Sequence, residues 1–151
     1  MTNLVVIENK ASAVKKYLKI LERYQSYRQD ELATNVDIRG AVERYLYLVC
    51  QTTVDLAEAL LAYRKFRKPT SLSDTFYILQ EENIISPELT DKLVRMTGFR
   101  NAIAHDYENF DYQIAYDVLH HRLSDIKEFL KVLGVHGFLS SLLSVCLKSK
   151  L

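Results

Sequence analysis

Hydrophobic residues recur every three or four positions along most of this 151-residue chain. The first such stripe runs from Leu4 to Leu21, and the positions between its members are largely polar or charged. A stripe of this kind buries one face of a helix and leaves the other in water, so it predicts a helix over residues 3–26. No segment shows sustained alternation of polar and apolar residues, and strands are therefore not expected.

A second stripe runs from Val42 to Tyr63 in a stretch without proline. It predicts a long helix over residues 30–67, bent or broken near residues 37–40. Pro69 is expected to end this helix, because proline lacks the backbone N–H that the helix needs.

The rest of the chain carries the usual signals of helix starts and stops. The clearest is Ser86-Pro87-Glu88, in which a serine can cap, proline occupies the first helical position and an acid lies in the first turn. These signals predict a short helix over 74–82, a helix over 87–105, a loop over 106–111, a helix from Asp111 to Gly134, and one further short helix over 137–148.

The expected fold class is therefore all-α: an antiparallel bundle of four main helices with short additional helices. The 4 glycines and 2 prolines leave few turns, which favours a handful of long helices. A formal net charge of +1 argues against a uniformly basic surface for nucleic acid, although it says nothing about a local basic patch.

The two cysteines and the apolar stretches indicate a soluble protein of the cytoplasm. Cys50 and Cys146 lie within apolar helical patterns without metal-ligand spacing, so we expect reduced packing residues and no metal site. Residues 1–10 lack the apolar run of a signal peptide, and residues 132–147 fall short of the roughly 20 apolar residues of a membrane span. No membrane association is expected.

Candidate chemistry is concentrated in residues 98–107, where Arg100-Asn101 is followed by His105 and Tyr107. Asn101 and His105 share one helix face, so the amide can orient the imidazole. Arg100 lies five positions before His105, about 140° around the helix. A twofold homodimer in which two copies of the motif face each other would bring both residue types into one cleft.

Such a set suits metal-free cleavage of RNA. That reaction needs a base for the 2′-hydroxyl proton, an acid for the leaving oxygen and positive charge near the phosphorane. Histidine can serve either proton role, and arginine stays charged and contacts phosphate through two N–H groups. The alternative is structural: Arg100 in a surface ion pair and His105 as a charge partner of the helix C-terminus.

Three further segments accompany the motif: Arg39-Gly40-Ala41-Val42-Glu43-Arg44, then Ser71 with Phe76 and Leu79, and Ile84-Ile85-Ser86-Pro87-Glu88-Leu89. Together with Arg-Asn-x3-His-x-Tyr they resemble the HepT family of HEPN-domain toxins over residues 30–133. The family's hallmark is Arg-x4-6-His, and the tyrosine two positions after the histidine is characteristic of the HepT branch. On this basis residues 1–133 are interpreted as the HEPN domain and 134–151 as a C-terminal extension.

The resemblance implies a homodimeric, metal-independent endoribonuclease that cuts tRNA or mRNA as the toxin of a toxin–antitoxin pair. It assigns Arg100, Asn101 and His105 to catalysis. Its partner would be a nucleotidyltransferase antitoxin of the MntA type, which uses ATP to AMPylate Tyr107; the added adenylate would fill the phosphate-binding cleft. The chain itself has no P-loop, GxGxxG or GxSxG motif, so no cofactor of its own is expected. The alternative function is a non-catalytic helical partner of a nucleotidyltransferase.

Three other sets of conspicuous residues each have a structural interpretation and a functional one. His120 and His121 point about 100° apart on a helix, so a solvated face is favoured over a metal site, with RNA contact as the alternative. The basic run 64–68 fits a helix C-terminus, or alternatively an RNA backbone contact. Tyr112 and Tyr116 are expected to pack on the preceding loop or, alternatively, to stack on a base.

Overall fold

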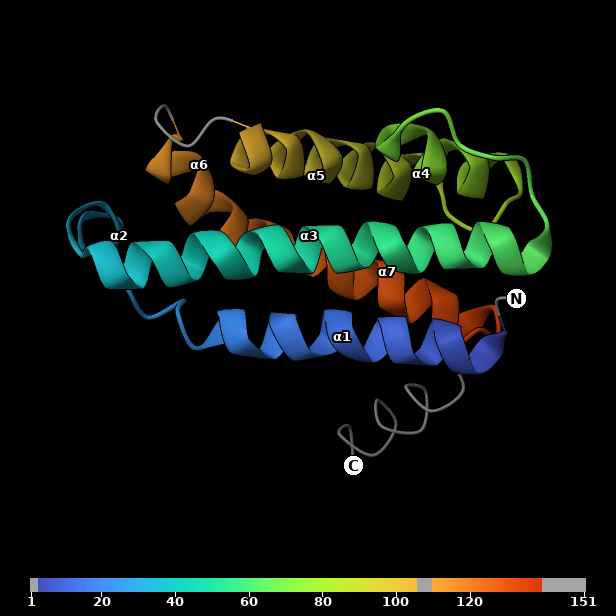
Figure 1. Cartoon of the computed structure of the whole chain (residues 1–151), viewed down its shortest axis with the longest axis horizontal. Coiled ribbons are helices and arrows are strands. Elements are labelled where there is room, and N and C mark those ends of the chain that lie inside the picture. Colours follow the sequence, from blue (N-terminus) through green and yellow to red (C-terminus); the bar gives the residue numbers. More distant parts are fainter. Residues whose placement is uncertain (1–2, 106–109, 140–151) are drawn as a thin grey trace.

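The computed structural model describes residues 3–105 and 110–139, and every regular element within them is helical. Figure 1 shows the longest helix, α3, between α1 on one side and α4 with α5 on the other. The elements are α1 (Leu4–Glu22), α2 (Gln29–Thr34), α3 (Val36–Arg64), α4 (Leu72–Glu81), α5 (Pro87–His105), α6 (Tyr112–Asp117), the π-helix η1 (Val118–Arg122) and α7 (Leu123–Val135).

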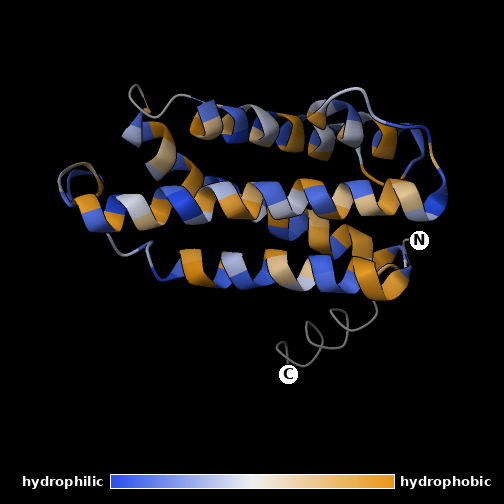
Figure 2. Cartoon of the chain, viewed as in Figure 1, coloured by the Kyte–Doolittle hydropathy of each residue, from blue (hydrophilic) through white to orange (hydrophobic). Residues whose placement is uncertain are grey.

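The four main helices α1, α3, α5 and α7 alternate in direction along the chain (Figure 1), and α1 and α5 both pack against α3 while α7 packs against α5. Hydrophobic and hydrophilic residues are interspersed along each helix (Figure 2), because each helix buries one face in the common core and leaves the other exposed. The expected all-α, antiparallel four-helix bundle with short additions is confirmed, with the large side chains of Phe76 and Phe129 fully buried at its centre.

The long helix expected over 30–67 is two helices, and its break lies at Asn35 rather than at residues 37–40. The Asn35 backbone is extended, and its side chain accepts hydrogen bonds from the N–H groups of Asp37 and Ile38, both at 3.2 Å. Asparagine competes in this way with the helical backbone, so it ends α2 and caps α3 at once. The first helix also ends earlier than expected, at Glu22.

Pro69 does not end α3, and that prediction is wrong. The helix stops at Arg64, after which Lys65 adopts a left-handed conformation with φ of 57°. The N–H of Phe66 then donates to the carbonyl of Leu61 at 2.9 Å, and that of Lys65 donates to Ala62 at 3.2 Å. These two bonds form a Schellman motif, which satisfies the last carbonyls of the helix before proline is reached.

The helix expected from Asp111 to Gly134 is interrupted by the π-helical turn η1. Asp111 caps it as expected, by accepting a hydrogen bond from the Gln113 N–H at 2.8 Å. A π turn changes the angular phase of a helix, so residues before and after it do not share one stripe. Ile114, expected to face inward, is therefore 52% exposed, and Ala115 is buried instead.

The π turn also decides the environment of His120, and the solvated-face interpretation is wrong for this residue. The ring lies between two carbonyl oxygens, with Nδ1 2.9 Å from that of Tyr116 and Nε2 2.7 Å from that of Gln25. Gln25 Nε2 donates in return to the Leu119 carbonyl at 2.9 Å, so the corner after α1 is bonded to the π turn. His121 is exposed, as expected.

The core continues beyond residue 133. Phe138 and Leu139 are buried, and the Phe138 ring meets that of Tyr63 edge to face with centroids 6.5 Å apart. Residues 137–139 form a turn rather than the start of a helix, and the rest of the helix expected over 137–148 lies outside the described residues. The domain boundary after residue 133 stays a prediction.

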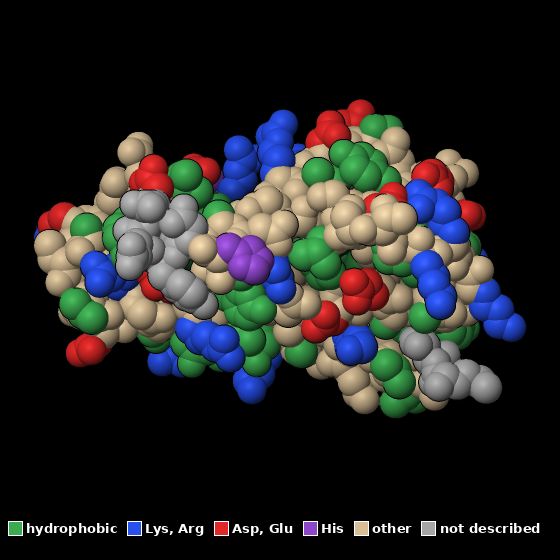
Figure 3. Space-filling model, turned by 45° about the horizontal axis from the view of Figure 1, so that its top comes forward, with side chains coloured by type: hydrophobic (Ala, Val, Ile, Leu, Met, Phe, Trp, Pro, Cys, Tyr) green, Lys and Arg blue, Asp and Glu red, His purple; other side chains and the backbone are tan. Residues whose placement is uncertain are grey.

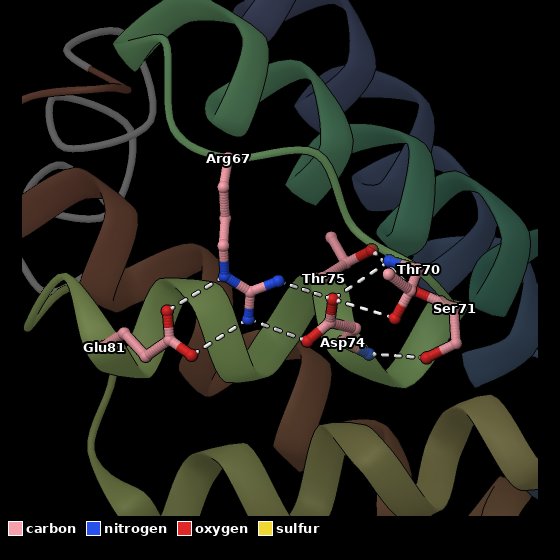
Figure 4. Close-up of polar contacts among 6 residues, drawn as sticks. All are labelled: Arg67, Thr70, Ser71, Asp74, Thr75 and Glu81. Atoms are coloured by element: carbon pink, nitrogen blue, oxygen red, sulfur yellow. Dashed lines mark hydrogen bonds and ion pairs between the residues drawn. The ribbon is translucent and has the colours of Figure 1, made fainter.

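The basic run 64–68 contains an ion-pair cluster centred on Arg67 (Figure 4). Its guanidinium donates to both carboxylate oxygens of Asp74, at 2.8 and 2.9 Å, and to both of Glu81, at 2.9 and 3.2 Å. Asp74 also accepts from the Thr70 N–H at 2.9 Å. Arg67 therefore joins the loop after α3 to helix α4 through these ion pairs. This favours a structural role for the residue over contact with the RNA backbone.

We predict that Arg67→Ala lowers the Tm of the protein at pH 7. The hydrogen bonds from Arg67 hold the pKa of Asp74 far below its usual range and lower the pKa of Glu81. A carboxylate with a depressed native pKa adds stability that is complete above its unfolded pKa, about 4, and is lost as the pH falls through the native value. The Tm difference should therefore be full at pH 7 and shrink below pH 4 in thermal denaturation.

Lys68→Ala is the matched control. Lys68 is exposed and has no ion pair within the described part of the chain, so its removal should leave the Tm nearly unchanged. Equal Tm values for the two variants at every pH would contradict a stabilising role for the cluster.

Candidate functional site

A groove of about 470 Å³ lies between α3 and α5 and contains the predicted arginine and histidine. Arg44 and Tyr47 line it from α3, and Arg100 and His105 line it from α5, with Phe110 near one end. Figure 3 shows a face of the molecule on which a histidine has basic side chains close by. The five-residue spacing along α5 therefore does not separate Arg100 from His105, since both reach one groove.

Arg100 is half-buried and held by three neutral acceptors. Its Nε donates to Gln51 Oε1 at 2.9 Å, Nη1 donates to Asn101 Oδ1 at 3.1 Å, and Nη2 donates to the Tyr47 hydroxyl at 3.4 Å. No carboxylate within residues 3–105 and 110–139 forms an ion pair with it. The described residues thus do not contain the surface ion pair of the alternative interpretation, and none of their carboxylates neutralises this guanidinium directly.

His105 is the last residue of α5 and is exposed in the groove. Asn101 is also exposed, and its side-chain oxygen accepts from Arg100 rather than contacting His105. Among the described side chains no hydrogen bond joins Asn101 to His105, so the expected orientation of the imidazole by this amide is not present. Tyr107, the expected AMPylation site, lies outside the described residues.

Sequence reasoning missed the residues of α3 that face this site. The Tyr47 ring lies against two guanidinium groups, with its centroid 5.3 Å from the Cζ of Arg100 and 5.7 Å from that of Arg44. A cation over an aromatic face is attracted by the ring quadrupole, so Tyr47 holds two positive charges close together. The signal in the sequence was polar residues at helical spacing on α3: Arg44, Tyr47, Gln51 and Asp55.

An aromatic cluster includes Phe110, which lines the groove. Phe110 packs against Phe99 and Tyr112, with centroids 5.9 and 5.8 Å apart. The Cζ of Arg39 lies 5.0 Å from the Tyr112 ring centroid, and burial together with the nearby Glu43 carboxylate raises the pKa of the Tyr112 phenol. Tyr112 is thus a packed residue, in agreement with the interpretation favoured from the sequence.

Other chemistry finds no support in the described residues. They contain no group of three potential metal ligands among His, Cys, Asp and Glu side chains. Cys50 is a free, buried cysteine, and burial raises the pKa of its thiol to about 12, so it stays protonated. No helix in the described part of the chain is long and apolar enough to cross a membrane.

Fold and site together define the class of protein: a HEPN-like helical bundle that presents an arginine and a histidine of one helix in a groove. The sequence model described as Ribonuclease HepT-like matches residues 14–133. The chain belongs to the ribonuclease HepT-like family. The resemblance stated from the sequence is confirmed, and so, at the level of this family, is the expectation of a ribonuclease.

Individual relatives agree with this assignment. The chain is 27% identical over 132 residues to the mRNA nuclease HepT of Shewanella oneidensis, covering 85% of this chain and 96% of the relative. It is 27% identical over 113 residues to the tRNA nuclease HepT of Aphanizomenon flos-aquae, covering 74% and 77%. A solved structure of the tri-AMPylated Shewanella oneidensis HEPN toxin in complex with MNT antitoxin matches with a TM-score of 0.79 at 26% identity, over 89% of this chain and 99% of that one.

Proposed function

We propose that this protein cleaves RNA without a metal ion, with His105 as general acid and base and Arg100 as the phosphate-binding group. The observation that carries the proposal is the guanidinium of Arg100, which has no carboxylate partner among the described residues and shares a groove with His105. Negative charge accumulates on the phosphoryl oxygens during the reaction, and a positively charged side chain that no carboxylate neutralises can stabilise it.

The proposed reaction is attack of the RNA 2′-hydroxyl on its own phosphorus. A histidine removes the 2′-hydroxyl proton as the new O–P bond forms, and the bond to the 5′-oxygen breaks as that oxygen receives a proton. Arg100 stabilises the negative charge that accumulates on the non-bridging oxygens in between. The products are a 2′,3′-cyclic phosphate and a 5′-hydroxyl end, and no other reagent is consumed.

We propose that the functional unit is a homodimer. Within the described residues, the groove of one chain holds a single histidine, whereas the reaction needs a base and an acid at the same phosphodiester. Two copies related by a twofold axis would supply both, together with two arginines.

We propose that the chain acts in the cytoplasm as the toxin of a toxin–antitoxin pair, with tRNA or mRNA as substrate. The curated relatives are named as an mRNA nuclease and a tRNA nuclease, which supports both substrate classes. The similar Shewanella oneidensis toxin was solved in complex with an MNT antitoxin, which supports a nucleotidyltransferase of the MntA type as partner.

Incubation of the purified protein with structured RNA in EDTA tests the activity. We expect cleavage to proceed with the chelator present and to leave cyclic phosphate ends, identifiable by mass spectrometry of the fragments. RNA that stays intact at every protein concentration would reject the nuclease and favour a non-catalytic helical partner of a nucleotidyltransferase. Cleavage that requires added Mg²⁺ or Mn²⁺ would reject the metal-free mechanism.

We further propose Tyr107 as the residue that the antitoxin AMPylates. It follows His105 by two positions, so an adenylate there would add bulk and negative charge next to the groove. After incubation with the partner and ATP, the intact mass should rise in adenylate-sized steps and RNA cleavage should stop. The Tyr107→Phe variant should keep its mass and its activity.

Tyr77→Phe is the control for this experiment, because Tyr77 is an exposed tyrosine on α4, outside the groove. It should be modified as the wild type is. Adenylate on the Tyr107→Phe protein, located by peptide mapping at another residue, would show that the assignment is wrong.

A further inference from the structure

Four polar residues of α3 form a continuous line along the helix: Arg44, Tyr47, Gln51 and Asp55, separated by three, four and four positions. Such spacing places them on one face. Tyr47 and Gln51 both contact Arg100 of the neighbouring helix α5, and Gln51 contacts Asp55. The line thus connects the groove to a carboxylate two helical turns away from Tyr47.

Gln51 lies between the guanidinium of Arg100 and the carboxylate of Asp55. Only one orientation of its side-chain amide forms hydrogen bonds with both groups. Its Oε1 accepts from Arg100 Nε at 2.9 Å, and its Nε2 donates to Asp55 Oδ1 at 2.8 Å. An ionised aspartate only accepts hydrogen bonds and an arginine only donates them, so a flipped amide would lose both. Asp55 therefore keeps the carbonyl oxygen of Gln51 directed at Arg100.

We propose that Gln51, oriented by Asp55, is the positioning residue for Arg100 in the reaction. The inference rests on the proposed ribonuclease function and adds to it the residue through which α3 acts on the scissile phosphate. Gln51 does not touch RNA in this proposal. It fixes the guanidinium of Arg100, which lines the groove, through the hydrogen bond to Nε.

The number of donors supports this role. A guanidinium has five N–H donors. The hydrogen bonds to Gln51, Asn101 and Tyr47 use one N–H on Nε, one on Nη1 and one on Nη2, respectively. One N–H on each Nη atom is left, so the guanidinium keeps two donors for phosphate oxygens.

The neutrality of Gln51 matters as much as its position. A carboxylate in its place would hold Arg100 equally well but would cancel the positive charge that the phosphorane needs. Asp55 supplies a negative charge only beyond the amide, where it fixes Gln51 without bonding to the guanidinium. Fixing a long arginine side chain before RNA binds also lowers the entropy lost on reaching the transition state.

The experiment combines an NMR signal of the free protein with cleavage kinetics. The Nε–Hε resonance of Arg100, assigned by its loss in Arg100→Lys, should exchange slowly with water in the wild type. In Gln51→Leu we expect this exchange to accelerate about tenfold or more, as for loss of a hydrogen bond to a charged group. We expect kcat to fall about 10- to 100-fold with a smaller change in KM.

Two more variants separate position from charge. Gln51→Glu combined with Asp55→Asn, whose amide can donate to the new carboxylate, should keep the slow exchange, because a carboxylate also accepts from Nε, but should still lower kcat. In the Arg100→Ala background, Gln51→Leu should cause no further loss, because it acts only through Arg100. Gln29→Leu, an exposed glutamine on α2 outside the groove, controls for the general effect of the substitution.

Unchanged exchange and kcat in Gln51→Leu would overturn the proposal, as would an equal loss of activity in the Arg100→Ala background. Full activity of the Gln51→Glu/Asp55→Asn double variant would overturn the requirement for a neutral acceptor. If the wild type cleaves no RNA at all, the ribonuclease proposal fails, whereas the exchange of the Arg100 Nε–Hε still decides whether Gln51 positions this side chain.

Discussion

The His105→Ala variant is expected to lose RNA cleavage by about 10²- to 10⁴-fold in kcat, the usual contribution of a general acid–base residue. His105 is the one histidine that lines the groove between α3 and α5 within the described residues. Its removal leaves no imidazole among the described side chains of the groove, and imidazole is the group whose unperturbed pKa lies near neutral pH. Single-turnover cleavage of a labelled RNA in EDTA, at saturating protein, measures the loss directly.

The fold should survive this substitution, because His105 is exposed at the end of α5 and buries little surface. His121→Ala is the matched control: His121 is also an exposed histidine but lies outside the groove. It should cleave RNA at the wild-type rate. Equal activity of the two variants would remove His105 from the mechanism, and the general acid–base assignment with it.

The Arg100→Ala variant is expected to lose about 10²- to 10³-fold in kcat, as when a donor to a developing oxyanion is removed. We expect this large loss because the guanidinium of Arg100 keeps its full positive charge. Its three hydrogen-bond partners, Gln51, Tyr47 and Asn101, are neutral and hold it without cancelling that charge. Because a phosphate contact releases a counterion, the salt dependence of RNA binding should also become shallower by roughly one unit of slope. Expression of this variant should be less toxic to the host cell than the wild type.

Two substitutions test whether charge or geometry causes the effect. Arg100→Lys keeps the charge but loses the planar fork, so it should recover only part of the activity. Arg95→Ala is the control, since Arg95 is an exposed arginine of the same helix outside the groove. If Arg95→Ala lost as much activity as Arg100→Ala, general electrostatic attraction of RNA would explain the result, and the specific role would be rejected.

The sequence predicted helix ends correctly where one side chain forms a hydrogen bond with a backbone group only a few positions away. Ser86 and Pro87 start α5 as expected, with the Ser86 hydroxyl accepting from the Leu89 N–H at 3.1 Å. Asp111 caps α6 in the same local way. The prediction failed at Lys65, where the left-handed conformation of a lysine, supported by the packing of Phe66, ended α3 before the proline did.

The motif identified Arg100 and His105 because both lie on one short stretch of one helix, and the structure brings them to one groove. It did not identify the hydrogen-bond partners of Arg100. Asn101 was expected to serve the histidine and instead accepts from Arg100, because the neighbouring guanidinium reaches its oxygen directly. Gln51 was missed, since its helical spacing to Tyr47 and Asp55 places it on a polar face of α3 but does not say which residue of another helix it contacts.

The amino-acid sequence alone determined that this protein is helical, roughly where its main helices lie, and which arginine and histidine are its candidate reactive groups. These properties follow from interactions within a few residues, which periodicity, caps and a short motif record. Only the tertiary structure decided that Gln51 meets Arg100, 49 positions apart, and that Gln25 meets the ring of His120, 95 positions apart. Contacts at such separations depend on how whole helices pack and on the phase shift of a π turn, which no local pattern encodes.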